Sequence, residues 1–334
     1  MTLRIDALQY ANWSEKIFRQ MRDGGLDAVH VTITYHENFR ETVHNIEAWN
    51  RRFERFSEMI VQGFDAGDID RARETGRTAI FYGAQNPSCI EDDIGLVEVL
   101  HRLGLRFMQL SYNNQSLLAA GCYEAEDTGL TRMGREVVAE MNRVGMVVDM
   151  SHSGERSTLE AIGHSTRPVA ITHANPASWH PARRNKSDTV LRALAESGGM
   201  LGFSVYPHHL RDGGACGLRD FCEMIARTAD LMGVEHLGIG TDLCQDQPDS
   251  VVEWMRAGRW TRARDYGEGS AESPGFPPMP DWFRDNRDFA RIAGGLREAG
   301  FSTAEVAAVM GGNWAGFMAR GFGPARTPKR EAAQ

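Results

Sequence analysis

Two histidines with the spacing of a metal site lie in the segment DMSHSGERSTLEAIGHSTRPVAITH, residues 149–173. His152 and His173 each follow a short apolar run of β type, VVDMS and VAIT. If these runs are adjacent parallel strands, both imidazoles leave the same end of one sheet. Neutral imidazole nitrogens bind zinc, and two histidines with a carboxylate leave room for a reactive water. The segment therefore predicts a metal site that needs a further ligand.

Asp242 is the carboxylate that we expect to complete this site. It follows the segment HLGIGT, at the end of another apolar run. There it can ligate the metal or accept the proton of the water, as a general base does. An aspartate in this position can also simply cap the turn that follows.

Further polar and aromatic side chains follow the other predicted strands, at the end where a parallel barrel carries its active site. They are Tyr10, His36, Glu37, Gln85, Tyr112, Asn113, Asn114, His208 and His209. The tyrosines and Asn113 can donate hydrogen bonds to a carbonyl or an oxyanion. His208 and His209 follow a proline, which favours a role in a loop.

Arg184 is a candidate for holding a substrate carboxylate. It lies in the loop after the His173 strand, and a guanidinium can bind a carboxylate with two hydrogen bonds. The alternative is that Arg183, Arg184 and Lys186 form a solvated charged face.

Short apolar runs alternate with longer amphipathic segments along the chain, which is the pattern of βα units in a parallel sheet. Eight strands are predicted, at 4–8, 28–35, 78–84, 106–111, 146–151, 169–172, 200–205 and 236–241. Helices are predicted at 14–22, 43–74, 90–103, 132–144, 155–164, 189–196, 218–232, 285–298 and 303–310. Eight such units predict a single (β/α)8 TIM barrel over residues 1–323, with 324–334 as a disordered tail. Residues 264–280, rich in Gly and Pro, are either a lid or a surface connector.

Composition narrows the classes of function. The 334 residues carry a formal net charge of -8, which offers no basic surface for nucleic acid. No apolar run approaches the roughly 20 residues that cross a bilayer, and the N-terminus lacks a signal-peptide pattern, so we expect a cytoplasmic protein without membrane contact. The five cysteines form no CxxC pair and are expected to be free thiols: Cys89, Cys122, Cys216, Cys222 and Cys244.

Three motifs, in this order and spacing, resemble the renal or membrane dipeptidase family of metallopeptidases: DMSH, AITHANPASWHPARRNKSD and HLGIGTDL. The segment GLTRMGREVVAEMNRVGMVVDMSH supports the resemblance, which covers most of the chain from about Thr78 to Leu243. It implies a distorted barrel of the amidohydrolase type, with two zinc ions bridged by a glutamate, that cleaves dipeptides. Members are commonly homodimers.

Half of the family's site matches this chain residue by residue. His152 and His173 match the two histidines that bind the second zinc. Asp242 matches the aspartate that handles the proton of the bridging water and meets the substrate's amino group, and Arg184 matches the arginine that grips the substrate carboxylate. The roles that the resemblance implies for these four residues agree with the roles that their side-chain chemistry predicts.

The other half of the family's site is replaced. Leu8 and Tyr10 stand where the family has an HxD pair, and Gln85 stands where it has the bridging glutamate. Tyr112 replaces the histidine that polarises the scissile carbonyl. Leucine cannot ligate a metal, and a neutral glutamine cannot offset two divalent ions about 3.5–4 Å apart. A binuclear zinc centre is therefore not expected.

Three arrangements remain open. One zinc ion is held by His152 and His173, with Asp242 or Glu37 as a third ligand. Alternatively, the pocket holds no metal and is lined by tyrosines, Gln85 and the histidines. It then binds a small carboxylated metabolite, either to regulate another process or to transform the metabolite without hydrolysis. In the third arrangement, His36 and Glu37 rebuild a two-metal site. We take the first as the leading hypothesis: a dipeptidase-like amidohydrolase in which Asp242 is the general base, Tyr112 assists the carbonyl, and Arg184, Tyr10, Gln85 and Asn113 bind a small-molecule substrate.

Overall fold

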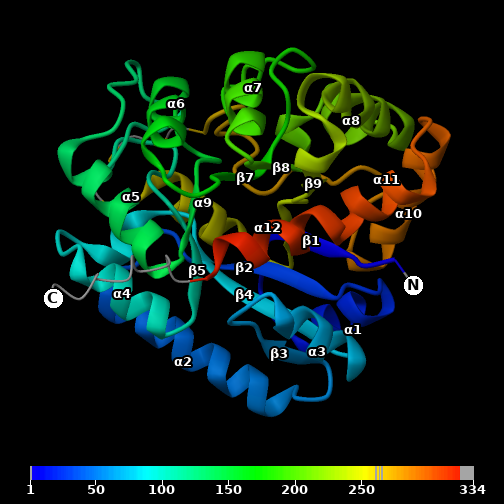
Figure 1. The fold of residues 1–334 in the computed structure, drawn as a ribbon, viewed down its shortest axis with the longest axis horizontal. Coiled ribbons are helices and arrows are strands. Elements are labelled where there is room, and N and C mark those ends of the chain that lie inside the picture. The colour runs from blue at the N-terminus through cyan, green and yellow to red at the C-terminus, as the bar shows by residue number, and fades with distance from the viewer. Residues whose placement is uncertain (1, 260–261, 263, 265, 324–334) are drawn as a thin grey trace, which may run out of the picture.

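Parallel strands form a closed barrel in the computed structural model, which describes residues 2–259, 262, 264 and 266–323 (Figure 1). Along the sheet the order is β10-β1-β2-β4-β5-β6-β7-β8-β9, and each recorded pairing is parallel. The strands are β1 (Ile5–Ala11), β2 (Ala28–Thr34), β4 (Thr78–Ala84), β5 (Leu105–Gln109), β6 (Val147–Asp149), β7 (Ala170–Ala174), β8 (Met200–Phe203), β9 (Leu237–Ile239) and β10 (Leu243–Gln245). The predicted α/β barrel is confirmed.

The eighth barrel strand is broken in two, and the break closes the barrel. β9 pairs with β8, whereas β10 pairs with β1, and only residues 240–242 separate them. Within this link the N–H of Gly240 donates to the carbonyl of Phe203, and the N–H of Asp242 donates to the carbonyl of Leu8 on β1. The break therefore presents Asp242 at the carboxyl end of the barrel.

Helices surround the barrel (Figure 1). They are α1 (Glu15–Asp23), α2 (Phe39–Arg55), α3 (Gly67–Glu74), α4 (Gly95–Arg102), α5 (Arg132–Val144), α6 (Glu155–His164), α7 (Asp188–Glu196), α8 (Leu218–Met232), α9 (Asp249–Ala257), α10 (Phe289–Glu298), α11 (Thr303–Ala307) and α12 (Asn313–Gly321). The two ends of α5 show how the local sequence sets where a helix begins and ends. The Thr131 side chain caps its first turn, and Gly145, with φ of 84°, ends it and leads into β6. Positive φ is cheap for glycine.

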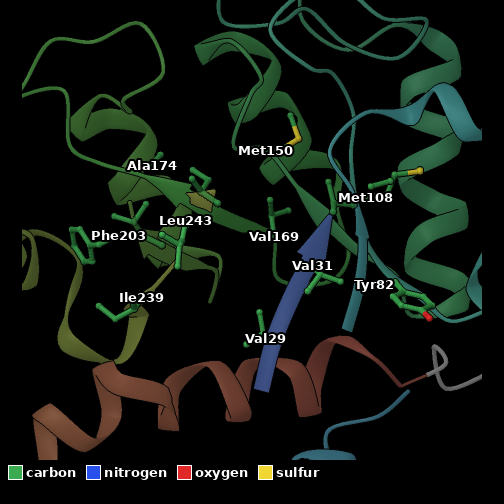
Figure 2. Close-up of a cluster of buried hydrophobic side chains, with 14 of the residues drawn as sticks. Val29, Val31, Tyr82, Met108, Met150, Val169, Ala174, Phe203, Ile239 and Leu243 are labelled. Carbon is green, nitrogen blue, oxygen red and sulfur yellow. The ribbon is translucent and has the colours of Figure 1, made fainter. Parts of the chain in front are cut away.

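Alternation along the strands separates two apolar layers. In β2, Val29, Val31 and Ile33 pack outward with Tyr82 of β4 and other members of the larger core cluster (Figure 2). Residues of the opposite parity point into the barrel, whose amino-terminal end is closed by α12. There Trp314 of α12 is fully buried and donates its indole N–H to the carbonyl of Ile239. The barrel floor is thus apolar, and the polar groups gather at the other end.

The structure corrects part of the predicted element map. Residues 43–74 are not one helix: they contain most of α2, the short strand β3 (Ile60–Gln62) and α3. β3 pairs with β4 outside the barrel path. The tail at 324–334 lies outside the described residues. In the described part of the chain, no helix is both long and apolar enough to cross a membrane.

Candidate functional site

A pocket with about 660 Å³ of empty space opens at the carboxyl ends of the strands. It is lined by Tyr10, Tyr35, Gln85, Tyr112, Asn113, Tyr123, His152, Arg184, Tyr206, His208, His209, Asp242, Cys244, Val252, Met255, Arg256, Tyr266, Gly267, Glu268 and Phe276. Seven of the eight predicted site residues are among them. The eighth, His173, lies directly behind the wall, where its ring contacts that of His152.

Asn113 fixes the orientation of His152. Its side-chain oxygen Oδ1 lies 2.6 Å from His152 Nδ1. An amide oxygen only accepts hydrogen bonds, so Nδ1 carries the proton and Nε2 keeps its lone pair. The ring of Tyr112 stacks on the imidazole at 4.2 Å between centroids.

His173 is held in the same tautomer by a different group. Thr172 Oγ1 donates its proton to Asp149 Oδ2 at 2.6 Å, so it accepts a hydrogen bond from His173 Nδ1 at 2.9 Å. The two Nε2 atoms then face each other at 3.0 Å with a lone pair on each. Burial, and next the charge of Arg184, lowers the pKa of both histidines well below the usual value. Two neutral nitrogens in this arrangement can share a cation.

Arg184 ties together the two loops that carry these histidines. Its guanidinium is 2% exposed and donates to the carbonyl of Ser151 and, at 3.1 Å, to that of His173. It therefore does not belong to a solvated face. Lys186 is also buried and donates to the carbonyl of Ser153 at 2.7 Å, and burial lowers its pKa to about 8.

Asp242 faces this pocket from the link between β9 and β10. Burial raises the pKa of its carboxyl to about 7; Arg184 acts in the opposite direction, and Asp6 adds to the increase. Within the described residues, no donor forms a hydrogen bond to the Asp242 carboxylate. Asp6 was not predicted from the sequence: its buried carboxylate accepts bonds from Thr241 and Gln9, and burial raises its pKa to about 6.

The side of the pocket near β1 does not fit a second metal ion. Leu8 is fully buried and apolar. Gln85 uses its amide N–H groups on Thr32 Oγ1 at 2.8 Å and on the Tyr35 hydroxyl at 2.9 Å. The ring of Tyr10 packs against that of Tyr35 at 4.8 Å. Neutral side chains thus occupy the positions that the resemblance assigns to metal ligands.

The alternative with His36 and Glu37 is not formed either. Glu37 accepts hydrogen bonds from the backbone N–H groups of Tyr35 and His36, at 2.6 and 3.0 Å. The His36 nitrogens contact the Met255 carbonyl and the Asn86 amide. Across the described chain, no group of three or more His, Cys, Asp or Glu side chains is placed to hold a metal. The Nε2 atoms of His152 and His173 remain as a pair of nitrogen donors that face each other across 3.0 Å.

The segment predicted as either a lid or a connector forms part of the pocket wall. Tyr266, Glu268 and Phe276 line the pocket. The Glu268 carboxylate accepts hydrogen bonds from the Tyr123 hydroxyl and, at 2.7 Å, from the backbone N–H of Arg183. These contacts hold the segment at the pocket, and whether it acts as a lid stays a prediction. Sequence reasoning did not single out these residues, nor Tyr35 and Tyr206.

Comparisons with known proteins identify the family of this chain. The family model described as membrane dipeptidase (peptidase family M19) matches residues 9–255. Dipeptidase tcpJ of Claviceps purpurea is 30% identical over 219 residues, 65% of this chain and 50% of that protein. Dipeptidase verJ of Clonostachys rogersoniana is 30% identical over 211 residues, 62% of this chain and 54% of that protein. The chain spans about half the length of the curated relatives it matches.

Solved structures extend the likeness over nearly the whole chain. An amidohydrolase from Pseudomonas aeruginosa is 36% identical, with a TM-score of 0.91, covering 96% of this chain and 97% of that one. A metallopeptidase from Rhodobacter sphaeroides, solved with a phosphinate mimic of L-Ala-D-Ala, shares the fold at 17% identity, with a TM-score of 0.78, covering 96% of this chain and 100% of that one. With the family model matched over most of its length, the chain belongs to the membrane dipeptidase family, peptidase family M19.

Proposed function

We propose that this protein is a metal-dependent hydrolase that cleaves an amide bond in a small amino-acid-derived substrate, such as a dipeptide. One observation carries the proposal: two neutral imidazoles direct their Nε2 lone pairs at each other across 3.0 Å, each fixed through Nδ1. Family membership and the relatives named dipeptidases support it. His152 and His173 would hold a single zinc ion. When bound, such an ion supplies Lewis-acid polarisation and makes water a better nucleophile near neutral pH.

The other pocket residues take roles that follow from their protonation. Asp242, whose pKa is raised to about 7, accepts and returns a proton near neutral pH. The Tyr112 hydroxyl keeps its proton because burial raises its pKa, so it can donate a hydrogen bond to the carbonyl oxygen. Arg184 binds the substrate carboxylate, and Tyr10 and Gln85 line the part of the substrate pocket near β1. Asn113 acts on His152 and contributes to substrate binding through its free N–H groups.

Metal analysis combined with a dipeptide panel tests this proposal. We expect chelated protein to regain one equivalent of zinc, and with it dipeptide hydrolysis. His152→Ala should lose both, whereas His44→Ala, on the exposed face of α2, should lose neither. Failure of zinc to rebind or to restore any turnover would refute the metal-dependent reaction. Two tightly bound ions would refute the single-ion site.

A metal-free binding protein is the second candidate, and the neutral packing near β1 favours it. Gln85, Tyr35 and Tyr10 fill the places of metal ligands with hydrogen bonds and ring contacts. In that case a small carboxylate should stabilise the chelated protein thermally while no dipeptide is turned over.

A further inference from the structure

Aromatic rings form a box on the side of the pocket where the metal ligands are replaced. Tyr10 and Tyr35 pack edge to face at 4.8 Å, and Tyr35 and Tyr112 do so at 5.1 Å, with interplanar angles of 83° in both pairs. Tyr206 and Phe276 form a similar pair at 6.3 Å and 87°. All five rings line the same pocket. Neighbouring rings are nearly perpendicular, and one face of Tyr112 is covered by the ring of His152.

Asp242 lies among these rings. It lines the same pocket as they do. Burial raises the pKa of Tyr35, Tyr112 and Tyr206, and the charge of Asp242 adds to this increase in each case. No described residue donates a hydrogen bond to it, while Arg184 interacts with it through space. A carboxylate in such surroundings favours a cation beside it.

The walls of the box select the kind of cation. A divalent ion requires more negative ligands than Asp242 alone, and the hydroxyls stay protonated because burial raises the pKa of these tyrosines. A primary ammonium has three N–H donors that need acceptors. A methylated ammonium has few or no such donors, and its charge, spread over the methyl groups, is attracted by aromatic faces.

We propose that this box binds a methylated ammonium group, with Asp242 as its counter-charge, at the amino end of a zwitterionic amino-acid derivative. The carboxylate of the ligand would face Arg184 or Arg256, which line the same pocket. The inference deepens the proposed function by naming the substrate class. It rests on that function only for the hydrolytic step, because binding to the box can be measured without an ion. Tyr112 links the two parts of the pocket, since its ring stacks on that of His152.

Three probes test the box in chelated protein by calorimetry: two match in shape and differ in charge, and the third keeps the charge without the methyl groups. N,N,N-trimethylglycine carries the methylated cation, 3,3-dimethylbutanoate replaces its nitrogen with neutral carbon, and glycine carries a primary ammonium. We expect trimethylglycine to bind at least tenfold more tightly than either of the other two. Equal affinity for the neutral isostere, or tighter binding of glycine, would overturn the proposal.

Variants at two positions separate the role of the rings from that of folding. Tyr10→Phe keeps the ring and should keep the preference for trimethylglycine over its isostere, whereas Tyr10→Leu should reduce it at least threefold. Asp242→Asn should abolish it. Thermal unfolding of each variant establishes that it is folded, and an unchanged preference in folded Tyr10→Leu and Asp242→Asn would refute the box. Loss of zinc-dependent turnover with this preference intact would refute only the proposed hydrolysis.

Discussion

Replacing Asn113 with glycine should weaken zinc binding by releasing the tautomer of His152. Asn113 has φ of 59°, a conformation that glycine adopts freely, so the variant removes the side chain without backbone strain. His152 Nδ1 then loses its acceptor, and the ring can carry its proton on Nε2 instead. At 3.0 Å this proton forms a hydrogen bond to His173 Nε2, which closes the pair without a metal.

Two contributions set the size of the effect. Loss of a group that orients a metal-binding histidine typically costs about 10- to 100-fold in metal affinity. The new hydrogen bond between the imidazoles, about 1 kcal/mol net, must also be broken before zinc binds. This raises the dissociation constant for zinc by a further factor of roughly five. We therefore expect the dissociation constant for zinc to rise on the order of 100-fold. The metal-free variant should be at least as stable as the wild type, since a repulsive pair becomes a bonded one.

Competition with a chromophoric chelator measures the affinity, and long-range ¹H–¹⁵N NMR of labelled histidine reports the tautomers. Asn113→Asp should retain zinc, because a carboxylate also accepts from Nδ1 and tolerates positive φ. Asn114→Gly is the matched control, next to Asn113 in the chain but outside the wall of this pocket, and should change neither quantity. Wild-type affinity in Asn113→Gly, with the His152 proton still on Nδ1, would show that the lone-pair argument is wrong.

Three further outcomes follow from burial and close contacts. The raised pKa of Asp242 means that the folded protein binds this proton more tightly than the unfolded chain, so the free energy of unfolding should fall as the pH rises from about 4 to about 7. In urea titrations, Asp242→Asn should reduce this slope, and Asp6, whose pKa burial raises to about 6, should account for part of what remains. Arg184→Met should cost about 3 kcal/mol of stability in the same assay, because two buried carbonyls lose a charged donor; a cost below 1 kcal/mol would contradict this. Gly238→Ala should destabilise by about 1–3 kcal/mol because the new Cβ would collide with Trp314 Nε1, whereas Gly294→Ala, on a helix with open space around it, should stabilise by about 0.5–1 kcal/mol; equal melting temperatures would refute both.

The barrel could be predicted because its strands have local signals. Apolar runs of β-branched residues, each reached through a helix with a marked end such as Gly145, predicted all eight strands near their observed positions. β3 could not be found this way, because three residues show no alternation and their pairing with β4 is decided by tertiary contacts. α9 begins directly after Pro248 and has an amphipathic sequence, so its signal was present but was not used.

The site was predictable as a set of residues but not as a network. The rule that side chains gather at the carboxyl ends of the strands brought His152, Asp242 and Gln85 to one pocket. The proton positions on the imidazoles depend on Asn113 and Thr172, whose contacts arise only when separate loops meet. Sequence patterns carry no information on such distances.

Under the proposed single-ion function, the charges around the pocket link binding of the ion to binding of the substrate. Among the described residues that line the pocket, the acids are Asp242 and Glu268, and Glu268 accepts hydrogen bonds from the Tyr123 hydroxyl and the backbone N–H of Arg183. Arg184 adds a buried positive charge beside the two imidazoles. One divalent ion there would leave a surplus of positive charge, which the carboxylate of a substrate on Arg184 would reduce. Ion and substrate should therefore favour each other's binding, because coupling between two sites is reciprocal.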